Sequence, residues 1–134
     1  MRRRNPLCVC QNCKKEFIGK KIRKYCSLKC QQEYQTNQKI KDWESGKILG
    51  YTGKTIKIKQ FIRNLLIKES GHRCSKCGWS KINFISHRVV LEINHIDGNS
   101  KNCLKENLEV LCPNCHSLTP NYKNLNKNSF RDRK

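Results

Sequence analysis

The sequence predicts an α+β fold made of two small modules, each held together by four cysteines instead of by a large apolar core. Two observations predict this organisation. The chain has 134 residues, of which only 36% are hydrophobic, so burial of apolar surface alone is not expected to stabilise it. It also has ten cysteines, several of them in closely spaced pairs. No apolar segment follows residues 1–6, so we expect a reducing, cytoplasmic location, where such pairs bind zinc and do not form disulfides.

The first module is expected over residues 1–45. Twelve residues, many of them lysine, separate its two cysteine pairs, which is enough for a short hairpin between them. Cys8 offers a third thiol beside the first pair, but loop geometry favours Cys10, so Cys8 is expected to be spare. Residues 28–44 contain no Gly or Pro and predict an exposed helix with Ser27 as its cap. The expected zinc ligands are Cys10, Cys13, Cys26 and Cys30.

A linker and an amphipathic helix are expected over residues 46–69. Three glycines and no clear periodicity in residues 45–55 indicate the linker. Apolar residues then recur at i, i+3, i+4, i+7 and i+8 from Ile58 to Leu66, which predicts a helix that ends near Gly71. The opposite face of this helix is basic and polar, and it either contacts phosphate or is simply solvated.

The second module is expected over residues 70–122. Residues 89–93 and 108–111 predict two strands, a polar loop begins at residues 97–99, and Pro113 suits the first turn of a helix. Trp43 and Trp79 are interpreted as local core anchors, and Cys103 as a packed thiol without a partner. Two Cys-x2-Cys pairs in one short unit are a specific sign of structural zinc. These expected ligands are Cys74, Cys77, Cys112 and Cys115.

The charge distribution indicates a polyanionic partner. The formal net charge is +19, and two four-cysteine zinc sites would lower it by only about four units. Residues 1–69 and 119–134 carry nearly all of this excess, whereas residues 70–118 are close to neutral. Basic flanks around a less charged centre favour nucleic acid as the partner, although a solubilising surface or a structural role would also explain the charge. No stretch is apolar enough to span a membrane, so a soluble protein is expected.

The second module resembles the HNH endonucleases, which have the ββα-metal fold. The resemblance covers residues 74–122 and includes both cysteine pairs at matching spacing. The complete layout, with an N-terminal zinc knuckle that ends in the stretch from Tyr25 to Tyr34, further resembles small endonucleases encoded by bacteriophages, some of which behave as homing enzymes. The motif residues are Leu91-Glu92-Ile93-Asn94-His95-Ile96-Asp97-Gly98-Asn99, Glu106-Asn107-Leu108 and Leu111-Cys112-Pro113-Asn114-Cys115-His116.

The resemblance implies a role for each signature residue. His95 would be the general base, since an imidazole with a reference pKa of about 6.5 can accept a proton at neutral pH. Asn107 would tie the loop backbone together and hold the His95 ring in position. Asn94 and His116 would bind the catalytic ion, Mg2+ or another divalent cation. The residue before the general base in this family is usually Asp, or His in some branches, whereas this chain has Asn94, so weaker metal affinity and a preference for Mn2+ or Ni2+ are expected.

The resemblance therefore implies a metal-dependent hydrolase that nicks or cleaves duplex DNA, in the host cytoplasm if the gene belongs to a phage. One alternative is a non-catalytic, zinc-dependent DNA-binding regulator on a degenerate HNH scaffold. It would leave DNA intact when divalent metal is present. Another is a structural RNA-binding protein, which would have no use for His95. Residues 123–134 are expected to form a basic tail. The segment 121–134 is rich in Asn and Lys, and it is expected to be flexible beyond its first few positions and to follow the DNA backbone.

Overall fold

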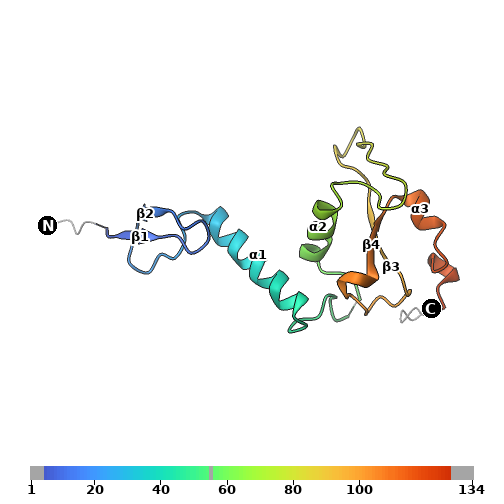
Figure 1. The fold of residues 1–134 in the computed structure, drawn as a ribbon, viewed down its shortest axis with the longest axis horizontal. Coiled ribbons are helices and arrows are strands. Elements are labelled where there is room, and N and C mark those ends of the chain that lie inside the picture. Colours follow the sequence, from blue (N-terminus) through green and yellow to red (C-terminus); the bar gives the residue numbers. More distant parts are fainter. Residues whose placement is uncertain (1–4, 55, 128–134) are drawn as a thin grey trace. The chain divides into compact units, whose positions relative to one another are not determined.

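The computed structural model describes residues 5–54 and 56–127, and it has the expected α+β composition (Figure 1). The chain divides into two compact units, Met1–Asp42 and Trp43–Lys134. The division falls inside a helix, three residues before the boundary expected at residue 45. Residues 46–69, expected as a separate linker and helix, are therefore part of the second unit. Among the described residues, no helix combines the length and apolar character needed to cross a membrane.

The first unit contains a small hairpin followed by a long helix. Strand β1 (Leu7–Val9) pairs antiparallel with β2 (Glu16–Ile18), and α1 (Leu28–Glu44) follows. Helix α1 has the predicted bounds, and the Ser27 hydroxyl accepts a hydrogen bond from the N–H of Cys30 at 3.2 Å, as expected of a cap. The hairpin differs from the prediction. Its strands flank the first cysteine pair, whereas the sequence suggested a hairpin between the two pairs.

The second unit is built around a two-stranded antiparallel sheet. Strand β3 (Glu92–His95) pairs with β4 (Leu108–Leu111), with His95 opposite Leu108. The other elements are α2 (Gln60–Glu69), α3 (Pro113–Ser117) and the 3-10 turns η1 (Lys105–Asn107) and η2 (Lys123–Leu125).

The prediction for the first strand of this sheet was wrong at both ends, since the strand begins three residues later and ends two residues later than expected. The sequence placed it at residues 89–93, with His95 just beyond it, but β3 includes His95. The apolar run misled the prediction because Val89 forms an isolated bridge with Ile82 instead of joining the sheet. Polar residues of the motif therefore stand within the strand.

The core of the second unit lies between α2 and the sheet. Ile62 and Leu66 of α2 are buried together with Leu91 and Leu111. Trp43, from the last turn of α1, is also buried there, and its indole N–H donates to the carbonyl oxygen of Cys103 at 2.9 Å. Such burial contributes roughly 1.5–3 kcal/mol for each large apolar side chain.

The segment expected as a linker also packs against this core. A Cβ at Gly50 would lie 2.4 Å from the Cβ of Cys103 and 3.0 Å from the Trp43 indole nitrogen, so no larger residue fits without a shift. Tyr51 forms an isolated bridge with Ile58, which precedes α2 instead of forming part of it. The glycine in this segment therefore permits a close backbone approach and does not mark a loose connection.

Candidate functional site

The eight cysteines predicted as zinc ligands gather into two clusters, one in each unit. Within each cluster the four sulfur atoms lie within 4.8 Å of one another. The sulfurs of Cys13 and Cys26 are 3.7 Å apart, as are those of Cys77 and Cys112. A tetrahedral zinc with 2.3 Å bonds to sulfur requires an edge of about 3.8 Å, so this spacing fits the ion and is far longer than a disulfide bond. Cys8 lies outside both clusters, as expected.

The electrostatics of the clusters also fit a bound cation. Burial raises the pKa of the Cys10 thiol, but N–H groups of Cys13, Cys26 and Asn12 outweigh this effect and lower it to about 6. The pKa of Cys26 instead rises to about 12, chiefly because its thiol hydrogen-bonds to Cys30. Four thiolates this close repel one another, and a divalent cation is what allows all of them to ionise.

The second cluster also fixes the helix that carries His116. Cys112 is the N-cap of α3, where its sulfur accepts from the N–H of Cys115 at 3.4 Å and Pro113 occupies the first turn. The N–H of His116 donates to the carbonyl oxygen of Cys112 at 2.9 Å. Two cysteines of the cluster therefore hold the turn that presents the His116 ring.

An open cleft of about 550 Å³ brings the motif residues together. Asn94, His95 and His116 all line it, as do Glu92 and Ser100. The Nδ1 atom of His116 is within hydrogen-bond distance of a carboxylate oxygen of Glu92. Glu92 lies within the motif, but the sequence did not indicate a role for it.

Asn94 has a different partner. Its amide nitrogen donates to the Glu109 carboxylate at 2.8 Å, from the opposite position on β4. Glu109 also forms an ion pair with Lys76 at 3.8 Å. The structure thus places Asn94 in the cleft but pairs His116 with Glu92, a residue two positions earlier on the same strand. The alternation of side chains along β3 would have indicated that Glu92 and Asn94 share a face.

Asn107 is buried behind the cleft and binds the loop that follows His95. Its side-chain oxygen accepts from the N–H of Asp97 at 3.1 Å. Its amide nitrogen donates to the Asp97 carboxylate at 2.9 Å and to the carbonyl oxygen of Asn102 at 2.8 Å. The backbone oxygen of Asn107 also accepts from the N–H of Ile96 at 2.9 Å. These contacts connect both ends of the loop to the residue preceding β4.

Asp97 belongs to the same network. Its carboxylate accepts hydrogen bonds from the side chains of Asn102 and Asn107 and from the N–H of Asn99. Burial raises the pKa of this carboxyl, but those hydrogen bonds outweigh burial and hold it below its ordinary value. The carboxylate thus stays ionised, and its hydrogen bonds stabilise the loop.

Cys103 contacts the candidate base, which the sequence did not indicate. Its sulfur lies 3.6 Å from Nε2 of His95 and 3.6 Å from the carbonyl oxygen of Ser100. Burial raises the pKa of the Cys103 thiol, so it is neutral at pH 7. Cys103 is thus the packed free thiol that was expected, and it also contacts His95 because the loop folds back towards the end of β3.

The chain from Asn121 onward also contributes to the cleft. The side chains of Asn121 and Asn126 donate to the carbonyl oxygens of Ile96 and Gly98 at 2.9 and 2.8 Å. A Cβ at Gly98, which has φ +75°, would lie 2.5 Å from the Asn126 side chain. The first positions of the basic tail, up to Asn126, thus pack on the loop, and residues 128–134, where flexibility was expected, lie outside the described residues.

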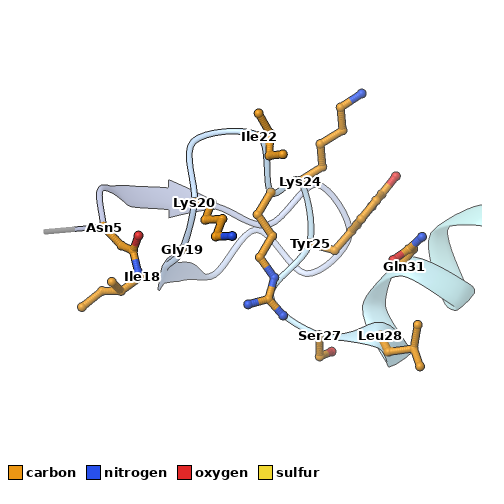
Figure 2. Close-up of a pocket in the computed structure, with 11 residues that line it drawn as sticks. Asn5, Ile18, Gly19, Lys20, Ile22, Lys24, Tyr25, Ser27, Leu28 and Gln31 are labelled. Carbon is orange, nitrogen blue, oxygen red and sulfur yellow. The ribbon is translucent and has the colours of Figure 1, made fainter. Parts of the chain in front are cut away.

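A second cavity, of about 730 Å³, lies on the first unit, and residues on both sides of Cys26 in the sequence line it (Figure 2). Lys20, Lys24 and Tyr25 line it, together with the apolar side chains of Ile18 and Ile22. Both isoleucines are exposed, and the Tyr25 ring lies 5.4 Å from that of Tyr34. This combination of cations and apolar surface suits a nucleic-acid contact.

Comparison with known proteins gives one informative match. No family model matches the chain, and no solved structure does. A stretch of 86 residues is 37% identical to the H-N-H endonuclease F-TflIV of Escherichia phage T5. The match covers 62% of this chain and 36% of that protein, so the chain spans little more than one third of its relative. Together with the two four-cysteine clusters, this similarity supports a relationship between the chain and the HNH endonucleases.

Proposed function

We propose that this protein is a metal-dependent endonuclease that hydrolyses phosphodiester bonds of duplex DNA. The observation that carries the proposal is that His95, Asn94 and His116 line one cleft together with Glu92, and that His116 directly follows Cys115 of a four-cysteine cluster. The sequence similarity to a phage endonuclease supports it independently.

His95 acts as the general base in this proposal and takes a proton from the attacking water. It stands at the end of β3, where pairing with Leu108 holds its backbone. The Asn107 network holds the loop immediately after it. Contact with the neutral Cys103 thiol restricts rotation of the ring. Together these contacts place the imidazole before substrate binds, so its orientation costs little when DNA arrives.

His116 and Asn94, as the resemblance implies, hold a divalent cation together with Glu92. The donor set fits: an imidazole, an amide oxygen and a carboxylate line one open cleft, and neither His116 nor Glu92 is fully buried. Glu92 supplies the negative charge that Asn94 lacks. When bound, the cation stabilises the negative charge that develops on the phosphate and the leaving oxygen. Because one ligand is an imidazole, this site should prefer Mn2+ to Mg2+ more strongly than a site made only of oxygen ligands would.

The two zinc clusters serve as scaffolds, and the basic surface supplies affinity. The first unit contributes its cationic cavity, and the net charge of +19 predicts strongly salt-dependent binding. Because the first unit carries many of these cations, it is proposed to bind the DNA backbone while the second unit performs the reaction.

The test is conversion of supercoiled plasmid to open-circular and linear forms by zinc-loaded protein. Wild type is compared with His95→Ala in Mg2+, in Mn2+ and without added divalent metal. The matched control is His72→Asn, because His72 is exposed, lies outside the cleft and has φ 57°, which Asn tolerates.

We expect metal-dependent cutting by wild type and by His72→Asn, and a loss of at least a hundredfold in His95→Ala. Gel-shift affinity for the plasmid should be the same in all three proteins. If none of them cuts with any metal while all bind DNA, the proposal fails and the non-catalytic DNA-binding alternative replaces it.

A further inference from the structure

We propose that residues 82–88 of the second unit form an apolar wedge that inserts between base pairs of bound DNA. The inference rests on the proposed DNA-binding function, but it concerns a surface outside the cleft. None of these residues lines the cleft or contributes to either cysteine cluster. The loop joins the first cysteine pair of the second unit to the strand that carries His95.

The tip of the loop exposes three large apolar side chains within four positions. Phe84 is 87% exposed, Ile85 81% and Ile82 67%. Single exposed apolar residues are common, but a continuous cluster usually marks a contact surface. In Figure 1 the yellow segment that contains this tip projects beyond α2 and the strands of its unit. A projecting tip suits insertion into a groove better than contact with a flat surface.

Local hydrogen bonds hold the tip in place. The side-chain oxygen of Asn83 accepts from the N–H groups of Ile85 and Ser86 at 2.9 and 2.8 Å. Its backbone N–H donates to the carbonyl oxygen of Arg88 at 2.8 Å, and Ile82 bridges to Val89 below the turn. An Asn that closes a turn in this way rigidifies the backbone. The apolar side chains are therefore held out towards solvent by the loop itself, and little ordering is required on binding.

Charge identifies DNA as the occupant. Lys81 and Arg88 flank the tip and are exposed, and residues 70–91 contain no Asp or Glu. Cations on either side of an apolar tip match a duplex, in which phosphates border the stacked bases. A symmetric contact between two copies would instead bring the same cations together. DNA-bending proteins insert Phe or Ile in this manner and partly unstack a base step.

The test uses His95→Ala protein, so that the plasmid stays intact. Closed-circular plasmid is relaxed by a metal-independent topoisomerase with increasing amounts of protein up to saturation, and the linking number is measured after protein removal. A wedge that unstacks base pairs leaves a linking-number change proportional to the amount of bound protein. Adding Phe84→Ala and Ile85→Ala should abolish this change and weaken binding about tenfold. Phe84→Leu alone keeps an apolar tip and should keep most of the change. Because these side chains are exposed, the variants should fold as wild type does.

The matched control is Lys81→Ala with Arg88→Ala. From the salt dependence of binding, the number of neutralised phosphate charges should fall by about two, while the linking-number change per bound protein should equal that of wild type.

The wedge is refuted if the Phe84 and Ile85 double variant retains the linking-number change. It is also refuted if the double variant only converts a dimer to a monomer in sedimentation, which would assign the tip to a second copy of the chain. If wild type cuts plasmid but bound protein never alters the linking number, the wedge alone fails. If no DNA is bound at all, the proposed function fails with it.

Discussion

Asn107 offers a direct test of how the candidate site is held. Replacing it with Ala removes three side-chain hydrogen bonds, two to Asp97 and one to the carbonyl oxygen of Asn102. Each is worth about 1 kcal/mol net, and the buried partners lose more if water cannot replace the amide. The expected loss is about 2–4 kcal/mol in the free energy of unfolding of the second unit.

Asn107→Asp is nearly isosteric, but it should be worse than Asn107→Ala at pH 7. Its carboxylate would stand where the amide nitrogen now lies 2.9 Å from the Asp97 carboxylate. The hydrogen bonds from the Asn102 side chain and the Asn99 N–H, which help to lower the pKa of Asp97, do not involve residue 107, so both carboxyl groups would be charged. Their repulsion raises the pKa of one carboxyl in the folded state. The penalty is thus present at neutral pH and decreases as the pH falls through that raised pKa, which is the opposite of the effect of a salt-bridged carboxylate.

Urea unfolding of zinc-loaded protein at pH 7 and pH 5 measures both effects, and plasmid cutting is assayed in parallel. Asn114→Ala is the control, because Asn114 is exposed and should change stability by less than about 0.5 kcal/mol. We expect kcat for Asn107→Ala to fall about a hundredfold, because the loop after His95 loses its attachment. If Asn107→Ala unfolds like Asn114→Ala, or if Asn107→Asp is the more stable of the two variants, the assigned role of the network is refuted.

Two further predictions concern sulfur. Cys103→Ala should lower kcat about tenfold with little change in KM, because Nε2 of His95 loses its neighbour; Cys103→Ser should restore most of the rate and keep the wild-type pH profile. Equal rates for both variants would argue against this contact. Cys112→Ser should abolish cutting even in excess Mg2+ and broaden the NMR signals of the second unit, since structural zinc supplies folding energy. Cys8→Ser, outside both clusters, should leave zinc content and cutting unchanged. Full activity of a zinc-depleted Cys112→Ser protein would exclude the scaffold role.

Several features followed from the sequence because they depend on short spacing. A pair of cysteines two or three residues apart closes a tight knuckle whatever surrounds it, so the members of both clusters could be named in advance. Helix α1 had the predicted bounds because Leu28–Glu44 lacks helix breakers. The apolar run at residues 89–93 was less informative. Pairing with β4 determines which residues join the sheet, and the hydrophobic pattern of one strand does not predict the register of that pairing.

The sequence by itself determined the cysteine clusters, the basic flanks and the polar motif around His95, since each is set by residue type and local spacing. Only the tertiary structure paired Glu92 with His116, placed Cys103 against His95 and buried Trp43 in the second unit. These contacts join segments up to 60 residues apart, as between Trp43 and Cys103. Such pairings follow from strand register, from the path of the loop that Asn107 ties together and from the close approach at Gly50. Each of these is decided by packing of the whole unit, so no local pattern could reveal it.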